Sequence, residues 1–230
     1  MCPMASTIPE KILVVDVGGT HAKFLMTGWT EKREADSGPA YTPTMLLADM
    51  ERLLAGATFD AVTIGLPIPM KAGKGLREPA NLGAGWKDFD FVAAFGKPTK
   101  VLNDAAMQAV GGYAGGRMLF LGLGTGLGSC LIEERHVLPL ELAHLPYKKR
   151  KTFEEFVGVR AKEKLGKKKW REEVASVISI LQCAILPDSI VLGGGNAKDL
   201  KELPAGCLLG DNANAFAGGF AVWQSRWTGI

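Results

Sequence analysis

The chain has 230 residues, of which 47% are hydrophobic and 22% are charged, and this composition excludes a disordered protein. A chain of this length can bury a substantial core in one large domain or two small ones. Its 27 Lys and Arg residues against 24 Asp and Glu residues give a net charge of +3, too balanced to indicate a nucleic-acid-binding protein. Glycine is frequent, at 29 residues without a collagen-like period, which indicates many tight turns.

The cysteines and the apolar runs predict a compartment. The cysteines form no CxxC pair and no spacing typical of a zinc site or a disulfide framework, so we expect a reducing, cytoplasmic environment. The N-terminus lacks the pattern of a secretory signal, and no apolar run reaches the roughly 20 residues that a membrane helix needs. The sequence therefore predicts a soluble protein without a membrane partner.

The first half of the chain begins with a strand, a glycine turn and a second strand. Residues 11–17 form a β-branched apolar run that ends at Gly18-Gly19, and residues 22–28 resume an alternating pattern. The next predicted elements are a helix over 43–55, a buried strand over 60–66, a loop-rich stretch over 70–90, a strand over 99–103 and a helix over 104–116 that Asp104 opens.

The second half repeats this pattern. A strand over 117–122, a glycine turn over 122–128 and a strand over 129–133 predict a second strand–turn–strand unit, and hence two related halves with an active-site cleft between them. The remaining predicted elements are a helix over about 169–186 that Pro187 ends, a strand over 189–192 that leads into Gly193-Gly194-Gly195, and a helix over about 212–227.

Three glycine turns are candidates for phosphate binding, because glycine lets backbone N–H groups approach an anion closely. Each turn alone is more often merely structural. The second turn does not fit the dinucleotide fingerprint, since Leu127 occupies a glycine position and a strand follows instead of a helix. The sequence also contains no P-loop motif, which leaves phosphate held by hairpin turns as the hypothesis.

Several polar residues stand at the ends of predicted strands. Asp16 can hold Mg²⁺ against a phosphate chain, or it can simply cap a turn. Asp104 can accept a hydroxyl proton, although Asp is also a common helix N-cap, and Asn103 beside it offers a hydrogen-bond donor and an acceptor. Further candidates for contact with a polyol, each also compatible with an ordinary loop or surface, are Asn81 and Trp86 in PANLGAGW, Glu141 and His144.

Five motifs span most of the chain: DVGGTHAKF (16–24), VLNDAAMQAVGGY (101–113), LGTGLGSCLI (123–132), ELAHL (141–145) and VLGGGNAKDL (191–200). They resemble, in order, those of the ROK-type sugar kinases of the sugar kinase, Hsp70 and actin superfamily. The resemblance implies an α/β fold with two ribonuclease H-like (actin-like ATPase) domains and a cleft between them. We expect domains at 1–110 and 111–230, with the C-terminal helix 213–230 able to pack on the first.

Within that family the chain looks most like the polyphosphate glucokinase branch. Typical ROK proteins carry a cysteine-rich zinc motif, whereas this chain has no cysteine between Cys130 and Cys183, so zinc is not expected. The resemblance implies that Asp104 is the general base and that Asp16 holds Mg²⁺ directly or through water. It implies sugar binding by Asn81, Asn103, Asp104, Glu141 and His144, and donor binding by Gly18, Gly19, Thr20, Lys23, Gly124, Thr125, Gly126, Gly193, Gly194 and Gly195.

The expected function is transfer of a phosphoryl group from polyphosphate, ATP or both to the 6-hydroxyl of glucose. The alternatives are an ATP-dependent kinase of another hexose or N-acetylhexosamine, and a non-catalytic sugar-sensing ROK protein. Residues 148–171 contain eleven Lys or Arg and three Glu, which is either a solvated helix face or a track for a polyanion. The resemblance is also compatible with a homodimer, and no nucleic-acid partner is expected.

Overall fold

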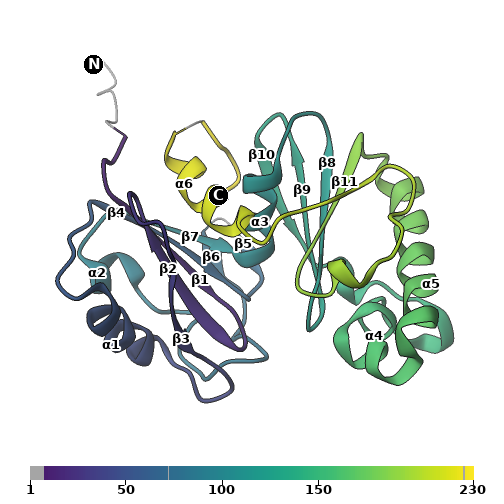
Figure 1. Ribbon diagram of the computed structural model, residues 1–230, viewed down its shortest axis with the longest axis horizontal. Coiled ribbons are helices and arrows are strands. Elements are labelled where there is room, and N and C mark those ends of the chain that lie inside the picture. The colour runs from purple at the N-terminus through teal and green to yellow at the C-terminus, as the bar shows by residue number, and fades with distance from the viewer. Residues whose placement is uncertain (1–7, 72, 225) are drawn as a thin grey trace. The chain divides into compact units, whose positions relative to one another are not determined.

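The structure is a computed structural model that describes residues 8–71, 73–224 and 226–230 (Figure 1). Its two five-stranded sheets and their helices confirm the predicted α/β class. The chain divides into two compact units. The first contains the described residues of Met1–Asn103 and Gly219–Arg226 together with Ile230, and the second contains Asp104–Gly218 and Trp227–Gly229.

The first unit is built on a mixed five-stranded sheet. Its central strand pairs in parallel with one neighbour and in antiparallel orientation with the other. In spatial order the strands are β3 (Arg33–Asp36), β2 (His21–Met26), β1 (Ile12–Val17), β4 (Ala61–Leu66) and β7 (Thr99–Asn103). A separate two-stranded sheet is formed by β5 (Met70–Lys71) and β6 (Lys74–Gly75).

Two helices cover one face of this sheet (Figure 1). α1 (Pro43–Leu54) and α2 (Phe91–Phe95) begin after Thr42 and Asp90, whose side chains accept hydrogen bonds from backbone N–H groups of the first helical turn. This arrangement places the apolar side of each helix on alternate residues of the strands. The shared core includes Leu13, Val15 and Val17 of β1, Leu46 and Leu54 of α1, and Phe91 and Phe95 of α2.

The other face of the first sheet contacts the second half of α6 (Asn214–Gln224). The Thr63 hydroxyl of β4 donates a hydrogen bond to the Gly219 carbonyl at 2.7 Å and accepts one from the Trp223 indole at 2.7 Å. The Lys100 ammonium of β7 donates to the Val222 carbonyl at 2.5 Å. These contacts satisfy polar groups in a mostly apolar interface.

The second unit repeats the strand order of the first. Its central strand, β8, pairs with β9 in antiparallel orientation and with β11 in parallel orientation. The repeated order confirms that the two strand–turn–strand patterns belong to related halves. The strands are, in spatial order, β10 (His136–Leu140), β9 (Leu127–Glu133), β8 (Met118–Leu123), β11 (Ser189–Gly193) and β12 (Cys207–Leu209).

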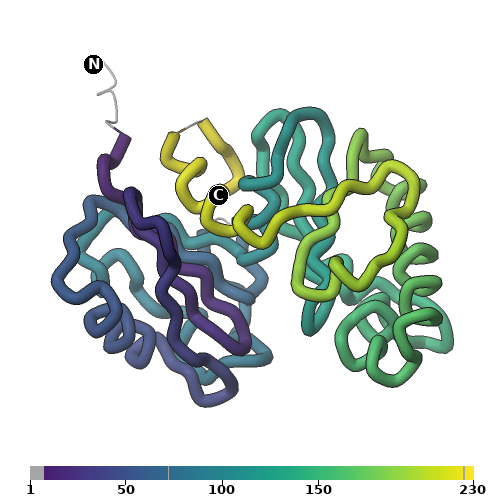
Figure 2. The backbone as a smooth tube through the Cα atoms, viewed as in Figure 1, coloured from purple at the N-terminus to yellow at the C-terminus, as the bar shows by residue number. Residues whose placement is uncertain are grey.

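Helices pack on both faces of the second sheet. α5 (Val159–Ile185) buries Trp170, Val174 and Leu181 against one face, and α3 (Asp104–Gly112) packs against β8 and β9. The chain then runs from β11 to α6 through a largely irregular stretch (Figure 2). The shorter elements are α4 (Glu154–Val157), η1 (Leu142–His144), η2 (Lys148–Arg150) and η3 (Ala197–Asp199).

The predicted helix over about 169–186 is wrong at its start. α5 begins at Val159 and continues past Gly166, whose backbone at φ 75° and ψ 157° interrupts the helical geometry. Lys and Arg favour helix formation, but a basic run weakens the apolar period that marks a helix in a sequence. The predicted helix over 104–116 likewise extends too far, because α3 ends at Gly112.

The predicted C-terminal helix over 213–230 is also too long. α6 ends at Gln224, and Thr228 forms a bridge with His136 beside β10. The Val137 amide donates to the Thr228 carbonyl at 2.9 Å, so strand pairing competes with the helix for these backbone groups. The predicted strands and the helix over 43–55 are confirmed. Among helices formed by the described residues, none is both long and apolar enough to cross a membrane.

Candidate functional site

The predicted ligand-binding residues of the first unit gather at one edge of its sheet. β1, β4 and β7 are parallel, with Asp16 in register with Gly65 and Leu66 in register with Asn103. The carboxyl ends of parallel strands meet at the same edge of a sheet. Asp16, the glycine turn after β1 and Asn103 therefore share this edge, where α/β sheets commonly bind ligands.

The glycine turn after β1 is held by hydrogen bonds. The Gly18 amide donates to the His21 carbonyl at 3.0 Å, and the Ser37 hydroxyl donates to the Gly18 carbonyl at 2.6 Å. Asn81 lies against the turn, because a Cβ built on Gly19 would be 3.1 Å from Asn81 Cβ. The structure thus brings a predicted sugar-binding residue together with a predicted phosphate-binding turn.

Asp16 is a largely buried carboxylate beside a cation. Its side chain is 15% exposed, and its Oδ2 lies 4.0 Å from Nζ of Lys23. Burial raises the pKa of the Asp16 carboxyl, and the charges of Lys23 and Lys32 oppose that rise. A further cation near this carboxylate would stabilise its ionised form.

Magnesium fits this position. Mg²⁺ usually binds through one or two carboxylates together with substrate phosphates and water, so a single carboxylate such as Asp16 suffices on the protein side. Among the described residues, no group of three or more His, Cys, Asp or Glu is arranged to hold a metal ion without a ligand's help. Asp16, beside the glycine turn, therefore suits a cation that a phosphate chain helps to hold.

Asn103 and Asp104 stand where β7 ends and α3 begins. The Asn103 side-chain amide donates to the Ile68 carbonyl at 3.0 Å, which fixes the orientation of its side chain. Asp104 is the first residue of α3, and its Oδ1 accepts a hydrogen bond from the Ala105 amide at 2.8 Å. Both the base and the N-cap interpretations of Asp104 are compatible with this placement.

Glu141 and His144 form a pair in the second unit. Oε2 of Glu141 lies 3.4 Å from Nε2 of His144, and the two side chains are 45% and 51% exposed. The buried Ser129 hydroxyl donates to the Leu140 carbonyl at 2.8 Å and accepts from the Leu142 amide at 3.2 Å, so it fixes the backbone on both sides of Glu141. The pair is accessible and can bind hydroxyl groups.

The second and third glycine turns lie side by side. β8 and β11 are parallel, and Gly122 is in register with Gly193. The Asn196 amide donates to the Leu123 carbonyl at 2.9 Å across the two turns. The structure therefore brings residues 124–126 and 193–195 together at the carboxyl edge of the second sheet.

The packing around the second and third turns explains the glycine at position 194 but not those at positions 124 and 195. Gly194 has φ 81°, and a Cβ there would lie 2.5 Å from the Leu123 carbonyl oxygen, so the fold itself requires glycine. A Cβ on Gly124 or Gly195 would meet no atom within 4 Å, and neither residue has a left-handed φ. Glycine at these two positions fits the close approach of a ligand to the backbone.

The junction of α4 and α5 supports the second turn, and the sequence motifs do not reveal this contact. The Val159 amide donates to the carbonyls of Gly124 and Thr125 at 3.1 and 3.2 Å. A side chain on Gly126 would collide with Glu154 of α4. In the sequence, the junction is marked only by Gly158, the residue before α5. A single glycine is too common to identify such a junction.

The sequence of the chain is similar to those of two known proteins but matches no family model. No protein-family model matches the chain. It is 27% identical over 150 residues to the polyphosphate glucokinase of Mycobacterium leprae (strain TN). The aligned region covers 59% of this chain and 46% of that protein. The chain spans about half the length of the curated relatives it matches.

The solved structures are similar over nearly the whole chain. The inorganic polyphosphate/ATP-glucomannokinase of Arthrobacter sp. strain KM has a TM-score of 0.80 at 21% identity and covers 95% of this chain and 99% of its own. A ROK family glucokinase of Streptomyces griseus, solved with glucose and AMPPNP, has a TM-score of 0.74 at 14% identity, covering 92% and 98%. The chain has the fold of the ROK-type sugar kinases.

The ROK resemblance predicted from the motifs is thereby confirmed, together with the actin-like ATPase fold. The roles of individual residues in this ROK fold stay predictions. The first unit contains Asp16, Gly18, Gly19, Thr20, Lys23, Asn81 and Asn103, and the second contains Asp104, Gly124, Thr125, Gly126, Glu141, His144, Gly193, Gly194 and Gly195.

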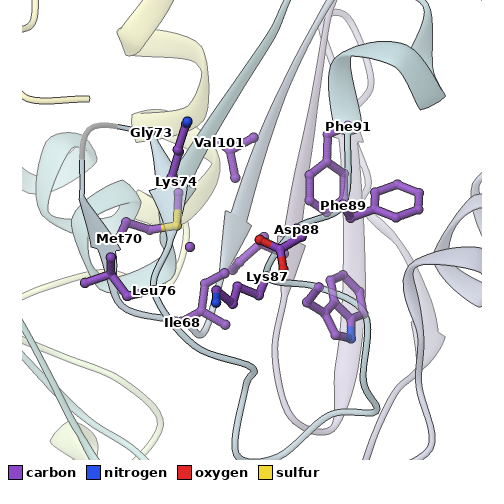
Figure 3. Close-up of a pocket in the computed structure, with 13 residues that line it drawn as sticks. Ile68, Met70, Gly73, Lys74, Leu76, Lys87, Asp88, Phe89, Phe91 and Val101 are labelled. Atoms are coloured by element: carbon purple, nitrogen blue, oxygen red, sulfur yellow. The ribbon is translucent and has the colours of Figure 1, made fainter.

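Trp86, a candidate for sugar contact, is instead part of the core of the first unit. Its side chain is 1% exposed, and its indole donates to the Tyr41 carbonyl at 3.0 Å. Trp86 also helps to form the wall of a cavity of about 530 Å³ in the first unit. Figure 3 shows this cavity with Ile68, Phe89 and Phe91 among its lining residues. The cavity is mostly apolar, with Lys74, Lys87 and Asp88 among its lining residues, and no other predicted ligand-binding residue lines it.

Proposed function

We propose that this protein is a sugar kinase that transfers a phosphoryl group to the 6-hydroxyl of glucose, with polyphosphate, ATP or both as donor. The observation that carries the proposal is that sequence and structure comparisons lead independently to sugar kinases that use polyphosphate, as the names of the Mycobacterium leprae and Arthrobacter proteins state. The fold alone does not fix the activity, so the candidate residues must support it.

On this proposal, Asp104 accepts the proton of the 6-hydroxyl as that oxygen attacks the terminal phosphorus of the donor. Its position at the start of α3, directly after Asn103, supports this role. The carboxylate orients the hydroxyl and removes its proton, while the P–O bond to the rest of the donor breaks. Asn81, Asn103, Glu141 and His144 hold the other hydroxyl groups of the sugar.

The glycine turns bind the donor phosphates on this proposal. The turns at 18–20, 124–126 and 193–195 supply backbone N–H dipoles, apart from the Gly18 and Gly124 amides, which already donate to the carbonyls of His21 and Gly126 within their own turns. Lys23 adds a positive charge beside Asp16. Asp16 would hold magnesium, directly or through water, and a magnesium ion held there would supply charge neutralisation for the transferred group. Phosphoryl transfer depends mainly on such positioning and charge neutralisation.

Polyphosphate as a donor is supported by the basic surface formed by residues 148–151 and by α5. Part of its charge is balanced, for example by the ion pairs Lys148–Glu173 at 2.8 Å and Lys151–Glu155 at 3.0 Å. The excess of positive charge in 148–171 remains large. Such a surface attracts a long polyanion more strongly than it attracts ATP. The exposed cations include Lys149, Arg150, Lys164, Lys168 and Lys169.

The proposal includes the cellular location and the partners of the kinase. The cysteine pattern supports a cytoplasmic location, and the family resemblance supports a homodimer. The charge balance gives no support for a nucleic-acid partner.

The direct test measures sugar phosphate formed from glucose, mannose or N-acetylglucosamine, each with Mg²⁺ and either ATP or long-chain polyphosphate. We expect glucose to be phosphorylated, and polyphosphate to serve as donor. Transfer only from ATP to another sugar would replace the proposed specificity with the alternative kinase. Binding of glucose without transfer from either donor would favour the sugar-sensing alternative.

A further inference from the structure

Asn196 follows the third glycine turn and contacts the second. Its backbone amide donates to the Leu123 carbonyl at 2.9 Å, and its side-chain Nδ2 donates to the Gly124 carbonyl at 3.0 Å. Two hydrogen bonds from one residue therefore join the turns at 124–126 and 193–195. Gly124 and Gly195, the two glycines whose surroundings leave room for a side chain, lie at the two ends of this connection.

A cation from α5 fixes the side chain of Asn196. Lys162 Nζ donates to Asn196 Oδ1 and also pairs with Asp199 Oδ2 at 2.6 Å. The Lys162 side chain is 15% exposed, and Asp199 is 19% exposed, so water screens this cluster only partly. Because Lys162 occupies the oxygen of the Asn196 amide group, the nitrogen must face the Gly124 carbonyl.

Asp199 is in turn held from two further directions. Lys167 Nζ lies 2.7 Å from Asp199 Oδ1, and the Arg171 side chain donates to the Asp199 carbonyl at 2.7 Å. The two lysines lower the pKa of the Asp199 carboxyl to about 2, so Asp199 stays ionised at neutral pH. Charged hydrogen bonds, which are stronger than neutral ones, link α5 to Asn196 and Asp199. The Asn196 side chain extends this link to the second turn by a neutral hydrogen bond to the Gly124 carbonyl.

We propose that Asn196, oriented by Lys162, is a positioning residue that holds the second and third glycine turns in one arrangement for the phosphoryl donor. This inference rests on the proposed kinase function. Backbone N–H groups can bind phosphate well only if the turns that carry them are fixed before the donor arrives. Asn196 itself touches the turns and not the reacting atoms, so its effect is on donor binding.

The test compares Asn196→Ala and Lys162→Met with the wild type and with Lys198→Met. Lys198 is exposed, lies two residues from Asn196, and its loss removes the same charge as the loss of Lys162. We expect Asn196→Ala and Lys162→Met to raise the KM of the donor about tenfold or more, the size expected for a lost charge-assisted hydrogen bond. The KM of glucose stays within about twofold of the wild type. Lys162→Arg, which keeps a cation, recovers most of the donor affinity.

Deuterium exchange of the ligand-free protein gives a second readout that does not depend on activity. We expect faster exchange in the peptides over 122–126 and 193–196 in Asn196→Ala and in Lys162→Met, but not in Lys198→Met. A donor KM and an exchange pattern equal to those of Lys198→Met would overturn the inference and leave the kinase function standing. A wild-type protein without transfer activity would contradict the kinase function, while the exchange pattern still tests the link between the turns. If Asn196→Ala does not fold, Asn196→Ser serves in its place.

Discussion

At the scale of single residues, Asp104 carries the chemical step of the proposed reaction. We expect Asp104→Asn to lower kcat about 10²- to 10⁴-fold, because it removes the base from the site. The substitution keeps an oxygen that can accept from the Ala105 amide, so the start of α3 is preserved. Glucose binding measured by calorimetry stays within a few-fold of the wild type. A variant with nearly wild-type kcat would show that Asp104 is only an N-cap.

Gly194 and Gly195 are neighbours with opposite predicted sensitivities. Gly194→Ala should destabilise the protein by about 1–3 kcal/mol, because φ is 81° and the new Cβ would meet the Leu123 carbonyl. Gly195→Ala should leave the free energy of unfolding within about 0.5 kcal/mol and raise the KM of the donor. Urea unfolding and donor kinetics check both values. Equal stability losses in the two variants would contradict the assignment of Gly195 to ligand binding.

Asp16 should give the activity an acidic limit. Burial raises its pKa, so the carboxylate becomes protonated at a higher pH than an ordinary Asp does. On the proposed function, this protonation would release magnesium. We expect kcat/KM to fall as the pH drops toward this raised pKa, and raising the Mg²⁺ concentration to shift the fall to lower pH. An acidic limit that does not respond to Mg²⁺ would contradict the role of Asp16.

The raised pKa of Asp16 also affects the stability of the fold, and here a lower pH is favourable, whereas it is unfavourable for activity. In the pH range between the ordinary and the raised pKa, the folded protein binds the Asp16 proton more tightly than the unfolded chain does, so this carboxyl makes stability fall as pH rises. Asp16→Asn should therefore unfold at higher urea than the wild type at pH 7 and lose this advantage at pH 3. An Asp16→Asn variant that is less stable at pH 7 would show that the pair with Lys23 outweighs the cost of burial.

At the scale of elements, α5 combines a buried apolar side with an exposed basic side, and the basic side tests the choice of donor. Replacement of Lys164 and Lys168 by Gln should raise the KM of long-chain polyphosphate several-fold and weaken its dependence on salt, while the KM of ATP changes little. Replacement of Lys11 and Lys97, exposed residues of the first unit, by Gln is the matched control. The same effect in both double variants would mean that only net charge matters.

Sequence patterns predict the buried strands better than the edge strands. β1 and β4 are apolar runs buried on both faces, and the strand propensity of their Val and Ile residues agrees with the tertiary structure. β3 has the sequence READ and one buried residue, and β10 contains Pro139, so neither shows a strand pattern. Both are edge strands, where neighbouring chain segments rather than local propensity decide the pairing.

The candidate site shows a similar limit. The sequence marks the glycine turns and the strand-end carboxylates because each has a local signature, such as Asp16 before Gly18-Gly19. Asn196 and Lys162 have no such signature, since an Asn after glycines is typical of any turn and a Lys in a basic run is typical of a solvated helix. Their contact joins residues that are 34 positions apart, so only the tertiary structure reveals it.

At the scale of the whole molecule, one sheet order occurs twice, and each copy places a glycine turn after its central strand. The first unit adds Asp16 and Asn103, and the second adds Glu141 and His144. The residues to which the proposed function assigns roles are therefore divided between the two units.

On the proposed function, this molecule phosphorylates the 6-hydroxyl of glucose. NMR of the product formed from glucose and Mg²⁺, with long-chain polyphosphate in one reaction and ATP in the other, tests it most directly. We predict that glucose 6-phosphate accumulates with polyphosphate and that its formation stops when glucose is omitted. A protein that binds glucose but forms no glucose 6-phosphate from either donor would contradict the claim.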